Sequence, residues 1–137
     1  MPTDIVLSID PGREKCGIAV VHKEHGVIYK NVITTAELIT TVTTLAATYN
    51  LTTTVIGDGT TSHTAQTALA TIKTNGHKLN IIPVDEHRST DEARTLYWTD
   101  NPPKGLKRLL PTTMQVPPVP VDDYVAVILA ERYFRER

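Results

Sequence analysis

The 137-residue chain has a single cysteine, no long hydrophobic run and almost no net charge. Because Cys16 is the only cysteine, an intramolecular disulfide framework and a zinc site built from several cysteines are both excluded. No stretch approaches the ~20 consecutive apolar residues that a membrane-spanning helix needs. The net charge of −1 argues mildly against a partner held by bulk electrostatics, such as nucleic acid, but a total charge does not say where the charges lie.

The composition is that of an ordinary globular protein, with 40% hydrophobic and 21% charged residues. The length fits one domain spanning residues 1–137, and such a domain buries a hydrophobic core without disulfides or a structural metal. The segment that follows Met1 lacks the basic and apolar regions of a secretory signal, so we expect a cytoplasmic protein.

Hydrophobic patterning predicts three consecutive strands, followed by strands that alternate with helices, in the order β-β-β-α-β-α-β-α-α. This order indicates an α/β fold, a mixed five-stranded sheet with helices on both faces. Ser89, with Glu92 three residues on, predicts a capping box at the start of the third helix. The proline-rich segment 111–120 predicts an extended loop. The expected strands are 5–9, 16–21, 27–33, 52–56 and 79–84, and the expected helices are 35–49, 62–73, 89–98 and 121–135.

Acidic residues stand where three of the strands end and where the last helix begins. In open α/β sheets, functional sites gather at such strand ends. Carboxylates that converge there repel one another unless they bind a divalent cation, and Mg²⁺ and Mn²⁺ prefer such oxygen ligands. Two such ions, ~4 Å apart, support phosphodiester cleavage. Each residue taken alone also fits an ordinary turn or the first turn of a helix. The acidic residues are Asp10, Asp58, Asp85, Glu86, Asp122 and Asp123.

Three motifs carry a resemblance to a known family. Ser8–Gly12 with Cys16–Val21, then Val84–Arg94, then Val121–Leu129 follow in the order and spacing of the YqgF (RuvX) family. This family consists of Holliday-junction-resolvase-like proteins with an RNase H-like fold. Together the motifs span nearly the whole chain.

The resemblance implies a nuclease that hydrolyses nucleic-acid phosphodiester bonds, acting in 5′-end maturation of the 16S rRNA precursor or on branched DNA. By motif position, Asp10, Glu86 and Asp122 would hold the catalytic Mg²⁺ or Mn²⁺. Asp58, Asp85 and Asp123 are additional candidates. The segment 56–62 departs from the family and resembles the RNase H-like domain of Tex-type proteins, so a non-catalytic nucleic-acid-binding module is the alternative function.

Basic residues near these acids are candidates for phosphate contacts, although a solvated surface explains them equally simply. The chain would act as a monomer or a homodimer, and a dimer would suit a two-fold junction. An ATPase of the actin and sugar-kinase type is a further alternative, but that family needs two related domains and a much longer chain. The candidate nucleic-acid-binding residues are Arg13, Lys15, Arg88, Lys104, Lys107 and Arg108.

Overall fold

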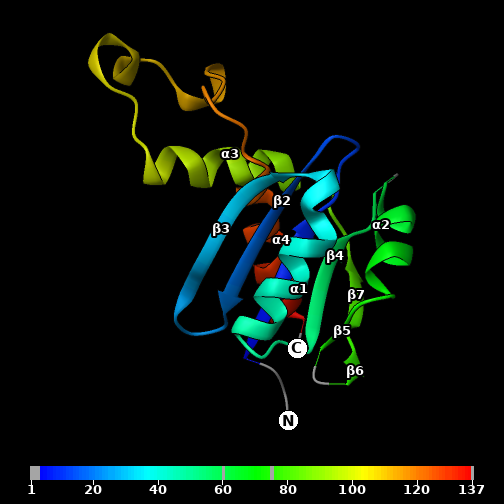
Figure 1. Cartoon of the computed structure of the whole chain (residues 1–137). Coiled ribbons are helices and arrows are strands. Elements are labelled where there is room, and N and C mark those ends of the chain that lie inside the picture. Colours follow the sequence, from blue (N-terminus) through cyan, green and yellow to red (C-terminus); the bar gives the residue numbers. More distant parts are fainter. Residues whose placement is uncertain (1–3, 60, 75, 137) are drawn as a thin grey trace.

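The computed structural model describes residues 4–59, 61–74 and 76–136, which form a five-stranded sheet flanked by helices (Figure 1). The strand order is β3-β2-β1-β4-β7. Strands β1, β2 and β3 form an antiparallel meander, whereas β4 and β7 run parallel to β1. The predicted mixed five-stranded α/β sheet is therefore confirmed. Its strands are β1 (Ile5–Asp10), β2 (Lys15–His22), β3 (Gly26–Thr34), β4 (Thr53–Gly57) and β7 (Asn80–Val84).

Helices cover both faces of the sheet, as the sequence predicts (Figure 1). Successive strand residues point to opposite faces, so β1 contributes Leu7 and Ile9 to one core and Val6 to the other. Helices α1 and α2 pack on the first face, and α3 and α4 on the second. None of the helices in the described ranges is long and apolar enough to cross a membrane. The helices are α1 (Leu38–Thr48), α2 (Ser62–Leu69), α3 (Ser89–Asp100) and α4 (Asp122–Arg135).

Helix α4 is the most deeply enclosed helix of the second face. Its residues 124–130 are all buried, because the sheet lies on one side and α3 on the other. At its N-terminus the approach to β2 is so close that a Cβ on Gly17 would collide with the backbone of Asp122 and lie 2.8 Å from the Asp123 nitrogen. Gly17 pairs with Asp10 across the sheet, so the acidic first turn of α4 lies beside the end of β1.

The second predicted helix is shorter than its pattern suggests. It ends at Leu69 rather than at residue 73, and a small hairpin of β5 (Lys73–Thr74) and β6 (His77–Lys78) follows. Ile72 continues the apolar pattern and is buried, but it reaches the core from the connection and not from the helix.

The start of α3 also differs from the prediction, because Ser89 is not its N-cap. Arg88 takes that position with a left-handed φ of 58°. The Ser89 N–H donates to the Glu86 carbonyl, and the Glu92 N–H donates to the Arg88 carbonyl. The turn after β7 therefore replaces the predicted capping box. Thr34 and Glu37 form such a box instead, before the 3₁₀ turn η1 (Thr35–Glu37) that leads into α1.

Residues 102–121 form an arm that projects from the end of α3 and returns to α4 (yellow to orange in Figure 1). The predicted loop 111–120 is its second half. The arm contains two 3₁₀ turns, η2 (Gly105–Leu109) and η3 (Thr112–Met114). The Gln115 side-chain amide donates to the carbonyls of Lys107 and Leu110, which ties the two halves together.

Gly17→Ala is expected to destabilise the protein by about 3 kcal/mol, because the new methyl group would overlap the backbone of α4, which cannot move without repacking the helix. Gly26→Ala is the matched control. That residue has a φ of 80° but open space around it, so only the left-handed conformation opposes the methyl group, at about 1 kcal/mol. Urea unfolding measures both, and equal losses would contradict this account of α4.

Candidate functional site

The candidate site lies where β1 ends beneath the first turn of α4. The side chains of Val6 and Ser8 face α4, so the alternation along the strand places Asp10 on the same face. Asp10 and Asp122 line one cavity of about 410 Å³. Two elements far apart in the sequence therefore bring these acids together.

Glu86 enters the site from β7, which is separated from β1 by β4. It follows β7, and its carboxylate lies over Gly57 and Gly59, where a Cβ on either glycine would collide with the carboxylate oxygens. Asp58, between the two glycines, is exposed, and its Oδ1 accepts a hydrogen bond from the Glu86 N–H at 3.4 Å. Asp58 thus lies beside Glu86 and contacts its backbone.

The electrostatics show that the three carboxylates share one environment. Burial raises the pKa of Asp10 from 3.8 to about 7, and the negative charges of Asp122 and Glu86 add to the shift. Burial, together with the charges of Asp58 and Asp85, also raises the pKa of Glu86. A partly buried carboxylate with acidic neighbours and a strongly raised pKa, as Asp10 has, is a feature of functional sites.

The cluster is looser than a preformed metal site. Across the part of the chain that the structure describes, no three His, Cys, Asp or Glu side chains converge closely enough to hold a metal ion. Asp122 pairs instead with the ammonium of Lys15, at 3.8 Å from Oδ2 to Nζ. This ion pair is half-exposed, so it contributes little stability and can open at small cost.

Two of the additional candidates face elsewhere. The Asp123 carboxylate accepts from Lys30 of β3 at 3.3 Å and from the Tyr124 N–H at 2.9 Å. Asp85 accepts from the His87 N–H at 3.0 Å and lines a separate hollow with Arg132. The structure therefore brings neither carboxylate to Asp10, although the charge of Asp85 still acts on Glu86.

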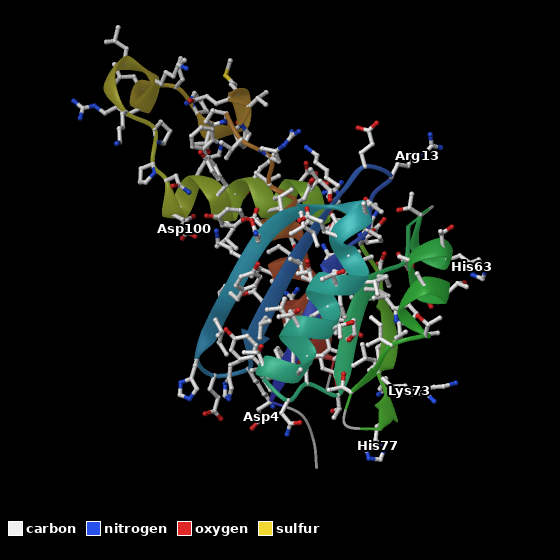
Figure 2. All side chains as sticks on the ribbon, viewed as in Figure 1. Asp4, Arg13, His63, Lys73, His77 and Asp100 are labelled. Carbon is white, nitrogen blue, oxygen red and sulfur yellow. The ribbon has the colours of Figure 1, made fainter. Side chains whose placement is uncertain are left out.

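The basic candidates fall into three places. Arg13 and Lys15 line the Asp10 cavity, and Figure 2 shows Arg13 at the opposite end of the molecule from Asp4. Arg88 is exposed at the start of α3. The remaining candidates, Lys104, Lys107 and Arg108, are exposed on the arm.

The sequence did not reveal two features that shape the site. Gly17 and the pair Gly57 and Gly59 leave the space that α4 and Glu86 fill. Lys30, which holds Asp123 and lies 4.3 Å from the centre of the Tyr124 ring, was not singled out. Gly17 lies near the start of β2 and Gly57 ends β4, so they stand on the two strands that flank β1.

Comparison with known proteins shows a likeness in structure alone. No family model and no curated protein matches the chain. The RuvC structure from Thermus thermophilus superposes with a TM-score of 0.62 at 13% identity, covering 96% of this chain and 94% of RuvC. T. thermophilus RuvC in complex with a Holliday junction substrate gives a TM-score of 0.60 at 13% identity, with coverages of 97% and 95%. The chain therefore has the RNase H-like fold of RuvC.

In metal-free buffer, Asp10→Asn is expected to stabilise the protein above pH 7. The folded wild type keeps the Asp10 proton up to about pH 7, whereas the unfolded chain releases it near 3.8. The wild type therefore loses stability as the pH rises between these values, by at most ~4 kcal/mol, and Asn avoids this loss.

The measurement is the free energy of unfolding of variant and wild type across this pH range, in the presence of a chelator. The stability advantage of Asp10→Asn should grow with pH and level off above about 7. Asp4→Asn, exposed before the start of β1, is the control and should show a flat difference. If the stability difference between Asp10→Asn and the wild type were also independent of pH, the Asp10 carboxylate would not lie in the partly buried, acidic environment that the structure shows.

Proposed function

We propose that the chain is a metal-dependent nuclease that hydrolyses nucleic-acid phosphodiester bonds. The observation that carries the proposal is the partly buried Asp10 carboxylate at a strand end, whose pKa is raised to about 7 by burial and by the charges of Asp122 and Glu86. Carboxylates that repel one another in this way are stabilised by a bound cation.

The residues fit Mg²⁺ or Mn²⁺, because both ions prefer hard oxygen donors and the cluster supplies only carboxylates. Asp10, Glu86 and Asp122 would hold the metal, which would supply an activated water and stabilise the leaving oxygen. Lys15 would exchange its contact with Asp122 for a substrate phosphate beside Asp10. Arg13, which is exposed on the same cavity, would bind a neighbouring phosphate.

Nucleic acid is the proposed substrate. One matched RuvC structure is a complex with a Holliday junction substrate, and this supports the same chemical class here. The three motifs favour the YqgF (RuvX) family, and with it 5′-end maturation of the 16S rRNA precursor in the cytoplasm, as a single domain. Branched DNA is the other substrate to test. Chains in solution would be monomers or homodimers.

A non-catalytic nucleic-acid-binding module, as in Tex-type proteins, is the second candidate. The ion pair between Lys15 and Asp122 favours it, because the Lys15 ammonium already supplies the positive charge that a metal ion would otherwise bring to Asp122. The two functions differ in one outcome, since both bind nucleic acid but only the first cleaves it.

Cleavage of a labelled 16S precursor fragment and of a four-way DNA junction, each with Mg²⁺ or Mn²⁺, tests the proposal. Asp10→Asn, Glu86→Gln and Asp122→Asn should each lower the rate by more than about 100-fold, because even outer partners of a metal site contribute 10–100-fold. Asp4→Asn keeps the acidic site intact and should cleave as the wild type does.

Equal rates for the wild type and Asp10→Asn would refute the catalytic assignment, since the activity would then come from a contaminant or another site. Tight binding without cleavage by any form, with either metal, would favour the binding module. Asp58→Asn distinguishes the contribution of Asp58 from that of Glu86. A smaller loss than for Glu86→Gln is expected, because the Asp58 side chain contacts the Glu86 backbone.

A further inference from the structure

A second cavity, of about 640 Å³, lies between the end of α3 and the arm. It shares no lining residue with the Asp10 cavity among the residues that the structure describes. Its walls are aromatic and apolar, and two lysines stand among them. The lining that matters here is Tyr97, Trp98, Pro103, Lys104, Lys107 and Met114.

The charge of the arm points to a polyanion as its partner. Lys104, Lys107 and Arg108 give residues 102–121 a charge of +3 with no acidic residue, whereas the rest of the chain carries −4. All three side chains are exposed, and none forms a salt bridge within the described ranges. The chain thus concentrates unpaired positive charge on the segment that projects furthest from the sheet.

Trp98 adds an aromatic side chain to the wall of the cavity. The indole lines the cavity and lies edge-on to Tyr97, with ring centroids 5.1 Å apart. Its Nε1 is buried and has no hydrogen-bond acceptor in the structure as described. Because this nitrogen is closed to solvent, a ligand in the cavity would contact the indole ring and not its N–H. An aromatic ring in the wall of the cavity suits a nucleobase, which has a π-face.

The cavity is connected to the first turn of α4. Asn101 lines it and donates to the Tyr124 hydroxyl at 3.3 Å, and that hydroxyl donates to Asp100 at 3.2 Å. Tyr124 follows Asp122 by two residues, and the last residue of the arm directly precedes Asp122. In Figure 2 the arm, which leaves α3 after Asp100, and the loop with Arg13 both lie in the upper part of the view, the arm on the left and Arg13 on the right.

The prolines of the arm lower the conformational entropy that it would lose on binding a ligand. Six of the nine prolines of the chain lie in residues 102–121. Prolines restrict the backbone and favour extended segments, so the arm loses less conformational entropy on binding than a glycine-rich loop would. Leu106 and Met114, at 84% and 75% exposure, are open to a ligand that covers them.

We propose that the cavity between α3 and the arm binds an unpaired nucleobase, while Lys104 and Lys107 bind the flanking phosphates. The inference rests on the proposed function in taking nucleic acid as the substrate, and it narrows that substrate to one with an unpaired base near the Asp10 site. A fully paired duplex would contact the lysines without filling the cavity.

Trp98 is the only tryptophan, so its fluorescence reports directly on the cavity. The Asp10→Asn protein, with a chelator present to prevent cleavage, is titrated with single-stranded RNA and DNA oligonucleotides and with a hairpin of equal length. The two strands of this hairpin are joined by a polyethylene glycol linker in place of a nucleotide loop, so that every base is paired. Single strands should quench the fluorescence saturably, because a base stacks against the indole. The hairpin should bind, by fluorescence anisotropy of its label, without comparable quenching.

Paired variants test the phosphate contacts. Lys104→Gln with Lys107→Gln should weaken single-strand binding about tenfold and reduce the slope of log Kd against log salt by about 1.4. Lys73→Gln with Lys78→Gln, both exposed on the β5–β6 hairpin, removes the same charge and should leave both values unchanged. Met114→Ser should weaken the single strand and spare the hairpin.

Three results would overturn the proposal: no quenching by any oligonucleotide, equal quenching by single strand and hairpin, or a fluorescence change that follows protein concentration alone. The last would mean that a second copy of the chain covers the arm. The nuclease proposal and the cavity assignment can be refuted independently of each other. Quenching without cleavage by the wild type would leave the cavity assignment standing, and cleavage without quenching would remove only that assignment.

Discussion

The close contact between the first turn of α4 and Gly17 is the constraint on which the site depends. A side chain at that position would overlap the backbone of Asp122, so only glycine lets the helix approach the sheet beside Asp10. The contact places two acidic residues from opposite ends of the chain together. The buried residues 124–130 hold the helix there, because the sheet and α3 enclose them. The hydrophobic core thereby sets the position of a polar site.

The same packing creates an unfavourable electrostatic state. Asp10 is partly buried and lies near two other carboxylates, which is why its pKa rises to about 7. Glu86 reaches this environment because Gly57 and Gly59 leave space for its carboxylate. A bound cation would stabilise the folded protein by reducing this repulsion between carboxylates. Carboxylates with raised pKa values of this kind are concentrated at functional sites. The ion pair of Lys15 with Asp122 offsets part of the negative charge while no other cation is bound.

The sequence predicts the sheet and the faces of its helices well, because apolar periodicity records burial directly. Periodicity and composition do not resolve which of two adjacent acids faces the site, and only the family resemblance ranked Asp122 before Asp123. Asp122 and Asp123 are equivalent in a sequence, but successive helix residues point about 100° apart, and Asp123 meets Lys30 instead. The end of α2 was misplaced because Ile72 keeps the apolar pattern beyond the helix. The net charge of −1 gave no indication that the arm carries a charge of +3, because a net charge does not show where the charged residues lie.

A crystal structure of the wild type grown with Mn²⁺, with anomalous diffraction used to locate the metal, tests the central claim most directly. The account predicts an anomalous peak bounded by the carboxylates of Asp10, Glu86 and Asp122, with Lys15 moved off Asp122. No peak at these residues under Mn²⁺ concentrations that support cleavage, or a peak held by other side chains, would contradict it.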